Sequence, residues 1–279
     1  MIYSTMMCSS FSVLLAVYKD DDPRLFRTAL LSIFSNSLLP SELVIVADGE
    51  LSDDLYKIIT EFESQNSLRL VQLPRNLGLA SALNAGLVTI KTKYTIRADA
   101  DDYNYPERFE LLVAKLNEGF DLVGSAIREV DKAGAQVAYR YCPLTKDKIQ
   151  RFSRKRNPFN HMTVGFRTNA VLEVGGYPSI HLKEDYALWA LLLARKCRVC
   201  NIEAVLVDAT AGTEMFMRRG GLRYAMAEVD LQRHLVKCRL KSPISGMVDG
   251  ALRSIIFLMP NTLRKFVYLR FLRALRNKE

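Results

Sequence analysis

Three carboxylates within four residues are the densest group of reactive side chains in this sequence. Asp99, Asp101 and Asp102, interrupted only by Ala100, directly follow a strand-like run at 94–98. Like charges this close repel one another unless a cation lies among them. Hard divalent ions such as Mg²⁺ or Mn²⁺ prefer oxygen ligands, so the group predicts a metal site. The alternative is a solvated acidic turn that caps the next helix.

A second acidic pair, Glu184–Asp185, stands at the start of a helix expected over 183–194. Acidic side chains favour the first turn of any helix, so the pair is explained by helix capping alone. The same position would also present both carboxylates to a ligand, as a general base requires. Helix capping and a catalytic role are compatible, and the residue types alone do not show whether the pair has the second.

Buried strands alternate with helices in the first hundred residues. The strands are expected over 11–17, 43–47, 68–73 and 94–98. The helices are expected over 23–37, 51–64 and 79–90. This alternation predicts an α/β fold with a doubly wound, mostly parallel sheet. Ligands bind at the carboxyl ends of such strands, which should bring Tyr18, Asp48 and Asp99 together.

The remainder of the chain has a less regular pattern. A helix is expected over 105–117, then two strands over 121–130 and 135–141 that are joined by a hairpin turn. A further strand is expected over 198–207, and the chain from 219 onward is helical and basic. The pattern predicts one domain over residues 10–214, followed by a tail.

Positive charge is concentrated in that tail. The net charge is +9, whereas residues 215–279 hold 14 Lys or Arg against four Asp or Glu. Apolar residues interleave with the basic ones over 263–276, after a mostly apolar segment at 252–259 that is too short to cross a bilayer. We expect either a peripheral contact with an anionic membrane or a terminal helix packed on the core with a solvated basic face. The sequence contains no recognised nucleic-acid-binding module, so no nucleic-acid partner is expected.

The cysteines and the N-terminus indicate the compartment. Five scattered cysteines, an odd number, suit reducing surroundings. The first ten residues lack the basic segment of a signal peptide, and the sequence has no run of 18 apolar residues. We therefore expect a cytoplasmic protein, peripheral on the inner face of the cell membrane if the tail binds lipid.

Taken together, the motifs resemble the family 2 inverting glycosyltransferases, which share the nucleotide-binding fold called GT-A. The resemblance to the family covers residues 11 to about 189. The chain is also similar to amylovoran and O-antigen biosynthesis transferases, and this similarity extends into the tail. It depends on six segments in the family's order: VLLAVY (13–18), VIVADG (44–49), RNLGLASALN (75–84), RADADD (97–102), GGY (175–177) and EDYALW (184–189).

The resemblance implies a role for each matching residue. Asp48 would hold the nucleotide base, and Asp99 and Asp101 would bind the metal and the donor. Asp185 would be the catalytic base, with Glu184 orienting it or meeting the acceptor. The side chains expected to line the nucleotide-sugar are Val17, Tyr18, Asp48, Asn76, Asn84, Arg97, Asp99, Ala100, Asp101, Arg218 and Arg219.

Several assignments remain open at this stage. His161 is either structural or a site residue, and Trp189 either packs behind Asp185 or forms a platform for the acceptor sugar. Arg218 and Arg219 could clamp a diphosphate or form a solvated turn. The family often has two carboxylates after the second strand, whereas Asp48 stands alone here, next to Ala47.

The implied activity is the inverting transfer of one hexose or N-acetylhexosamine from a nucleotide-sugar, expected to be a UDP-sugar. The acceptor would be a sugar hydroxyl on a lipid-linked or oligosaccharide substrate in bacterial surface polysaccharide assembly. Residues 10–102 would then bind the nucleotide-sugar, residues 103–214 the acceptor, and residues 215–279 would form the basic helical region. The alternatives are a nucleotidyltransferase on a similar fold and a non-enzymatic module that binds membranes or nucleic acid.

Overall fold

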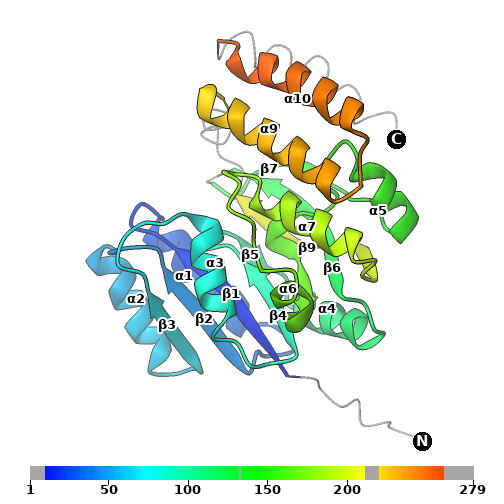
Figure 1. The fold of residues 1–279 in the computed structure, drawn as a ribbon. Helices are drawn as coiled ribbons and strands as arrows, with labels where there is room; N and C mark the ends of the chain where they lie inside the picture. Colours follow the sequence, from blue (N-terminus) through cyan, green and yellow to red (C-terminus); the bar gives the residue numbers. More distant parts are fainter. Residues whose placement is uncertain (1–9, 132, 211–219, 261–279) are drawn as a thin grey trace, which may run out of the picture.

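The computed structural model describes residues 10–131, 133–210 and 220–260, and these form a single sheet flanked by helices with a helical hairpin beside it (Figure 1). The sheet order is β3-β2-β1-β4-β8-β6-β9-β5, with β7 paired to the free part of β6. The strands are β1 (Phe11–Val17), β2 (Glu42–Ala47), β3 (Leu68–Gln72), β4 (Tyr94–Ala98), β5 (Tyr103–Asn104), β6 (Leu122–Val130), β7 (Gln136–Arg140), β8 (Gly165–Arg167) and β9 (Val199–Thr210).

Helices cover both faces of the sheet and form the hairpin. They are α1 (Pro23–Phe34), α2 (Asp53–Glu63), α3 (Leu79–Leu87), α4 (Arg108–Asn117), α5 (Lys146–Phe152), the 3₁₀ turn η1 (His161–Thr163), α6 (Thr168–Leu172), α7 (Glu184–Ala194), α9 (Leu222–Lys237) and α10 (Pro243–Leu258).

Strands β3, β2, β1 and β4 are all parallel, which confirms the predicted parallel arrangement of the first hundred residues. Their continuous apolar runs reflect burial on both faces, since consecutive side chains enter opposite cores. Val13 belongs to the core beneath α1, α2 and α4, whereas Leu14 belongs to the core shared with α3, α6 and α7. The parallel strands therefore lie between two packed layers, one on each face of the sheet.

The second part of the sheet is mixed in direction. Strand β8 runs antiparallel to β4 on one side and to β6 on the other, so it joins the two halves of the sheet. Strand β6 is parallel to β9 and forms the predicted hairpin with β7. The sequence analysis missed β5, β8, α5 and α6, because elements of two to seven residues are too short to show a period.

The C-terminal hairpin stacks α10 on α9, and α9 on α7 (Figure 1). Gly246 lets α10 approach closely, because a Cβ there would lie only 2.7 Å from Val236 Cγ2. The rings of Tyr224 and Phe257 meet edge to face at the other end of the pair, 4.7 Å apart. Within the described residues, none of the helices is long and apolar enough to span a bilayer.

Candidate active site

The acidic motif follows β4 at its carboxyl end, as predicted, and β9 holds its backbone in place. The Thr210 hydroxyl donates to the Asp101 carbonyl at 2.6 Å, and the Thr210 amide donates to Asp102 Oδ1 at 2.9 Å. Burial, together with the charges of Asp99 and Asp101, raises the pKa of Asp102 well above its ordinary value. Asp102 is thus a buried anchor, and Asp99 and Asp101 are the more accessible carboxylates.

A fourth carboxylate, Asp21, faces this group and was missed by the sequence analysis. Its Oδ2 accepts the Tyr18 amide at 2.9 Å, while the neighbouring Asp22 caps α1 through the Arg24 amide. Burial raises the pKa of Asp21 to about 7, and the charges of Asp101 and Asp99 add to the effect. Its place just beyond the end of β1 was the available signal, because loops at that edge face the ligand.

The donor set suits a hard cation, although the described residues contain no preformed cluster of three metal-binding side chains. The fit rests on carboxylates packed together below the surface: burial first, and then the charges of Asp99 and Asp101, raise the pKa of Asp21 and Asp102. It also rests on Asp102 Oδ2, a buried oxygen without a hydrogen-bond partner. A divalent ion would relieve both conditions.

Asp48, after β2, organises the loop that follows β3. Its two carboxylate oxygens accept the backbone amides of Leu77 and Gly78 at 2.7 and 2.9 Å. Gly49 is required beside it, because a Cβ there would lie 2.7 Å from the Asn76 nitrogen and its φ is +91°. Each Asp48 oxygen keeps a further lone pair, so contact with a nucleotide base stays a prediction.

Asn84 links α3 to the Gly-Gly-Tyr segment. Its amide nitrogen donates to the Tyr177 carbonyl at 2.9 Å, and its oxygen accepts the Tyr177 amide at 2.8 Å. A side chain at Gly176 would collide with this amide, since its Cβ would lie 2.3 Å from Asn84 Oδ1. In the described contacts Asn84 therefore supports the site, and its contact with the nucleotide-sugar stays a prediction.

The Glu184–Asp185 pair begins α7, and a residue from a distant loop orients it. Asn157 donates its side-chain amide to Asp185 Oδ2 at 2.6 Å, and the Tyr186 amide donates to Asp185 Oδ1 at 2.6 Å. Burial raises the pKa of Glu184 to about 7, with a further contribution from the charge of Asp185. Asn157 was missed by the sequence analysis, because no spacing rule relates it to Asp185.

Arg97 lies between the two acidic groups. It is buried and forms an ion pair with Asp99. Burial alone would lower the pKa of Arg97, but the charge and hydrogen bond of Asp99, together with the nearby Tyr177 and Asp102, outweigh burial and raise the pKa. The charge of Arg97 also acts on Glu184, so the structure brings both predicted carboxylate sets to one guanidinium.

His161 and Trp189 form an aromatic cluster behind α7. Trp189 is 0% exposed and packs edge to face against Phe159, at 5.6 Å between ring centres. His161 Nε2 lies 3.3 Å from the Tyr177 hydroxyl, and burial, with the charge of Arg97, holds the pKa of His161 well below its ordinary value. This burial favours packing for Trp189 over a sugar platform, and a neutral ring for His161.

The other predicted nucleotide contacts are placed in part. Val17 and Ala100 are buried at the ends of β1 and β4, with Tyr18 beside Asp21, whereas Asn76 is exposed on its loop. The predicted residues Arg218 and Arg219 lie outside the described residues.

A parallel half-sheet with carboxylates at its strand ends, joined to a mixed half, is the architecture of a GT-A glycosyltransferase. The chain matches the model of the glycosyl transferase family 2 over residues 12–177. With more than half of its length matched and close relatives along nearly all of it, this chain belongs to that family of enzymes. The nucleotidyltransferase and the non-enzymatic module gain no support.

Two relatives extend the similarity beyond the family domain. An *Escherichia coli* UDP-Gal:alpha-D-GlcNAc-diphosphoundecaprenol beta-1,3-galactosyltransferase is 34% identical over 94% of this chain and 96% of its own length. The amylovoran biosynthesis glycosyltransferase AmsE of *Erwinia amylovora* is 35% identical over 92% of this chain and 97% of its own. Both alignments therefore include part of the C-terminal hairpin region.

Solved structures share the fold at low sequence identity. *S. aureus* TarS (residues 1–349), crystallised with UDP-GlcNAc, gives a TM-score of 0.68 at 17% identity, over 94% of this chain and 76% of that one. The mannosyltransferase PcManGT of *Pyrobaculum calidifontis*, solved with GDP-Man and Mn²⁺, gives 0.60 at 14% identity, over 98% of this chain and 89% of that one.

Proposed function

We propose that this enzyme transfers one hexose or N-acetylhexosamine, with inversion, from a UDP-sugar to a sugar hydroxyl of a lipid-linked acceptor in bacterial surface polysaccharide assembly. The observation that supports this best is the placement of two acidic groups around Arg97. Asp99 pairs with Arg97 directly. The charge of Arg97 also acts on Glu184, the neighbour of Asp185. A displacement with inversion needs a leaving-group site and a base at one centre.

On the donor side, we assign the nucleotide to the loops at the carboxyl ends of β1, β2 and β4. Asp48 would accept a ring N–H from the base while keeping its two bonds to the 77–78 backbone. Asp99 and Asp101 would hold a divalent ion, Mn²⁺ or Mg²⁺. When bound, such an ion neutralises charge that develops on the departing diphosphate.

On the acceptor side, we assign Asp185 as the general base. Asn157 and the Tyr186 amide orient its two oxygens, which fixes the direction from which a hydroxyl must approach. Asp185 would take the proton of the acceptor hydroxyl as that oxygen attacks the anomeric carbon. Glu184, whose pKa is about 7, would hold a proton for part of the physiological range and could donate a hydrogen bond to the acceptor.

The acceptor class follows from the relative that uses a lipid diphosphate-linked N-acetylglucosamine, which aligns over nearly the whole chain. The test is incubation with UDP-galactose, UDP-glucose, UDP-GlcNAc and GDP-mannose, with and without a synthetic GlcNAc-diphospho-lipid. We expect release of UDP from one UDP-sugar that depends on the acceptor and on Mn²⁺ or Mg²⁺. A product whose anomeric configuration equals that of the donor would contradict inversion.

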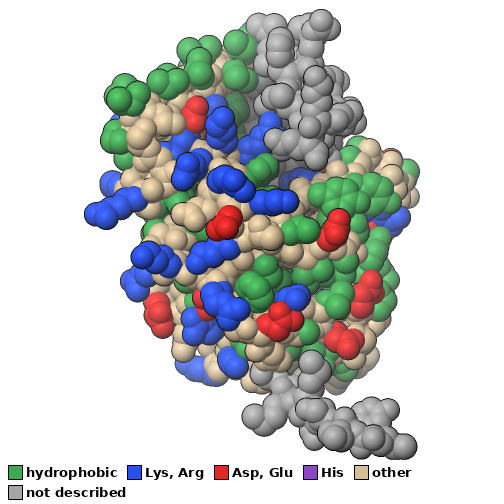
Figure 2. All heavy atoms as spheres, turned by 90° about the vertical axis from the view of Figure 1, so that its right-hand side faces the viewer, with side chains coloured by type: hydrophobic (Ala, Val, Ile, Leu, Met, Phe, Trp, Pro, Cys, Tyr) green, Lys and Arg blue, Asp and Glu red, His purple; other side chains and the backbone are tan. Residues whose placement is uncertain are grey.

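We also propose that the hairpin brings the enzyme to an anionic membrane surface. Figure 2 shows hydrophobic side chains along the upper edge, where α10 lies in Figure 1, and Lys and Arg side chains below them. The exposed apolar side chains of α10 recur at helical spacing and form one stripe: Ile244, Met247, Val248, Leu252, Ile255 and Leu258. The α5 segment carries exposed basic side chains: Lys146, Lys148, Arg151, Arg154 and Lys155.

This arrangement matches a bilayer interface, where apolar side chains enter the acyl region and cations meet lipid phosphates. The α5 segment and α10 are adjacent, since Arg154 and Ser242 line one shallow depression. Vesicles containing phosphatidylglycerol should therefore float with the enzyme, and less so as salt rises. Leu252→Glu should abolish flotation, whereas the matched control Leu31→Glu on α1, similarly exposed, should not. Absence of flotation at low salt would rule the contact out.

A further inference from the structure

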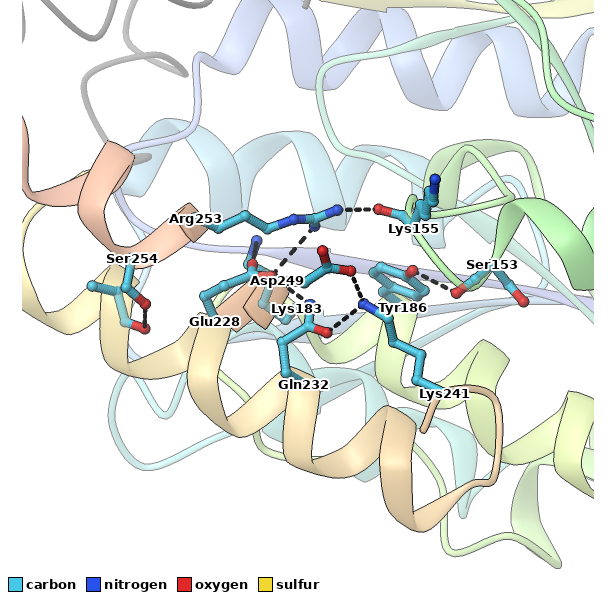
Figure 3. Close-up of polar contacts among 11 residues, drawn as sticks. Ser153, Lys155, Lys183, Tyr186, Glu228, Gln232, Lys241, Asp249, Arg253 and Ser254 are labelled. Carbon is cyan, nitrogen blue, oxygen red and sulfur yellow. Dashed lines mark hydrogen bonds and ion pairs between the residues drawn. The ribbon is translucent and has the colours of Figure 1, made fainter. Parts of the chain in front are cut away.

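Lys183, the residue before the Glu184–Asp185 pair, extends its side chain into the C-terminal hairpin. Its Nζ lies 2.9 Å from Glu228 Oε2 on α9 (Figure 3). The same nitrogen lies 4.4 Å from the centre of the Tyr224 ring. The Lys183 side chain is 13% exposed and that of Glu228 is 0% exposed. The start of α7 is thus joined to α9 by a buried ion pair.

Arg253, on α10, is linked to both segments that determine the position of Asp185, to one directly and to the other through Glu228. Its Nη1 lies 3.3 Å from Glu228 Oε1, and its Nη2 donates to the Lys155 carbonyl (Figure 3). Lys155 stands two residues before Asn157, whose amide binds Asp185. One guanidinium therefore connects, through Glu228, to the helix that bears Asp185 and, through Lys155, to the loop that orients it.

Glu228 is charged in this environment. Burial would raise its pKa, but the charges of Lys183 and Arg253 outweigh burial and lower it. Gln232 adds a hydrogen bond, donating to Glu228 Oε1 at 2.7 Å. A buried carboxylate that binds two cations and one amide leaves little freedom to the groups around it, because removing a partner from a buried ion pair is costly.

We propose that Glu228 and Arg253 are positioning residues for the catalytic base, so that the C-terminal hairpin is part of the active site. The proposal rests on the proposed role of Asp185. The hairpin holds the N-terminus of α7 and the 155–157 segment at a fixed separation, and Asp185 and Asn157 are thereby aligned. His234, donating to the Ala187 carbonyl at 3.0 Å, fixes the next turn of α7 on the same helix pair.

The test separates positioning from donor binding with three variants. Glu228→Gln keeps the size of the side chain but removes the charge that holds Lys183, and Arg253→Ala removes both of its contacts. We expect kcat to fall by about 10- to 100-fold, since small displacements of a catalytic group have effects of this size. KM for the donor and UDP affinity should stay within about twofold. Arg253→Lys keeps the ion pair with Glu228 but weakens the bond to the Lys155 carbonyl, because lysine lacks the second arm of the guanidinium. It should therefore recover part of the kcat that Arg253→Ala loses.

The matched control is Asp249→Asn in the same hairpin. Asp249 pairs with the buried Lys241 and joins α10 to the preceding loop. Lys241 also donates to Gln232, but among the described residues the pair forms no hydrogen bond or ion pair with α7 or the 155–157 segment. Asp249→Asn should lower the melting temperature while kcat stays within about twofold. Equal loss of kcat in Asp249→Asn and Arg253→Ala would show general destabilisation and overturn the proposal.

Asp185→Asn, measured in parallel, distinguishes this proposal from the assignment of the base. If Asp185→Asn is inactive while folded Glu228→Gln and Arg253→Ala keep normal kcat, the hairpin has no positioning role and the base assignment stands. If Asp185→Asn turns over normally, both proposals fall. Should Glu228→Gln fail to fold, the comparison of Arg253→Ala with Arg253→Lys still decides the question, because Arg253 is partly exposed.

Discussion

The proposed donor side and the proposed base side of the site are constructed differently. On the donor side, Asp48 and Asp99 directly follow β2 and β4, and Asp101 lies in the loop after β4 that Thr210 of β9 holds in place. On the base side, Asn157 orients the carboxylate of Asp185 in the first turn of α7, and Lys183 joins that turn to Glu228, 43 residues further along the chain from Asp185. Strand ends thus place the first set of carboxylates, and side-chain contacts between distant segments determine the direction of the second.

The largest expected effect is on the base side. Asp185→Asn keeps the size of the side chain but removes the proton acceptor, so turnover should fall by about 10² to 10⁴, the usual contribution of a general base. Donor affinity should barely change, because the donor is held from the other side. Steady-state kinetics and UDP binding measure both quantities. Loss of donor affinity instead would mean that Asp185 faces the nucleotide.

The donor side should respond in the opposite manner. Asp101→Ala should weaken metal-dependent UDP binding by about 10- to 100-fold, because it removes a carboxylate that we assign to the ion. The fold should persist, since Asp102, the buried member of the group, remains bonded to Thr210. Calorimetric titration with UDP, with and without Mn²⁺, gives the result. Equal enhancement by Mn²⁺ in variant and parent would remove Asp101 from the metal site.

A smaller effect is expected from the residue that orients the base. Asn157→Ala deletes the 2.6 Å bond to Asp185 Oδ2 but leaves the carboxylate in place. We expect about a tenfold fall in kcat with an unchanged donor KM, because only the direction of the base is lost. Asn157→Ser, which retains a donor, serves as the conservative comparison. An unchanged kcat in Asn157→Ala would show that the Tyr186 amide suffices.

The smallest effect concerns stability and its pH dependence. Burial and the charge of Asp185 raise the pKa of Glu184 from 4.5 to about 7. Between these values the folded state holds a proton that the unfolded state has released, so stability falls as pH rises from about 4.5 to 7. Glu184→Gln cannot ionise and should be more stable above pH 7 by up to about 3 kcal/mol. Urea unfolding at pH 4.5 and pH 8 tests this, and a gain that is independent of pH would contradict it.

The fold was largely predictable because long apolar runs have only one reasonable interpretation. The bounds of β1 and β4 agree with the sequence to the residue, and β2 and β3 differ by one. The expected helix at 105–117 begins only at Arg108. Strands β5 and β8, with two and three residues, exist because neighbouring strands pair with them, and local composition contains no record of that pairing.

The site was predictable where residues lie at strand ends and unpredictable where contacts cross the chain. Asp99, Asp101 and Asp185 could be recognised by motif, and their roles stay predictions; the structure adds that Asp99 and Glu184 both interact with Arg97. Asn157 and Glu228 lie 28 residues before Asp185 and 43 after it, and neither falls in a recognisable pattern. Asp21 could have been found from its position, but adjacent Asp22 explained the helix cap equally well.

The two hydrogen bonds from Thr210 to the acidic motif have a consequence for the order in which the protein matures during synthesis. The motif leaves the ribosome about a hundred residues before Thr210, the last residue of β9. Strand β5, which follows the motif, also waits for β9, since Tyr103 pairs with Asp208. A nascent chain can therefore assemble its parallel half-sheet early, yet the acidic loop acquires its final geometry only when β9 closes over it. We therefore expect the nascent chain to become able to bind the donor only late, after most of it has been translated.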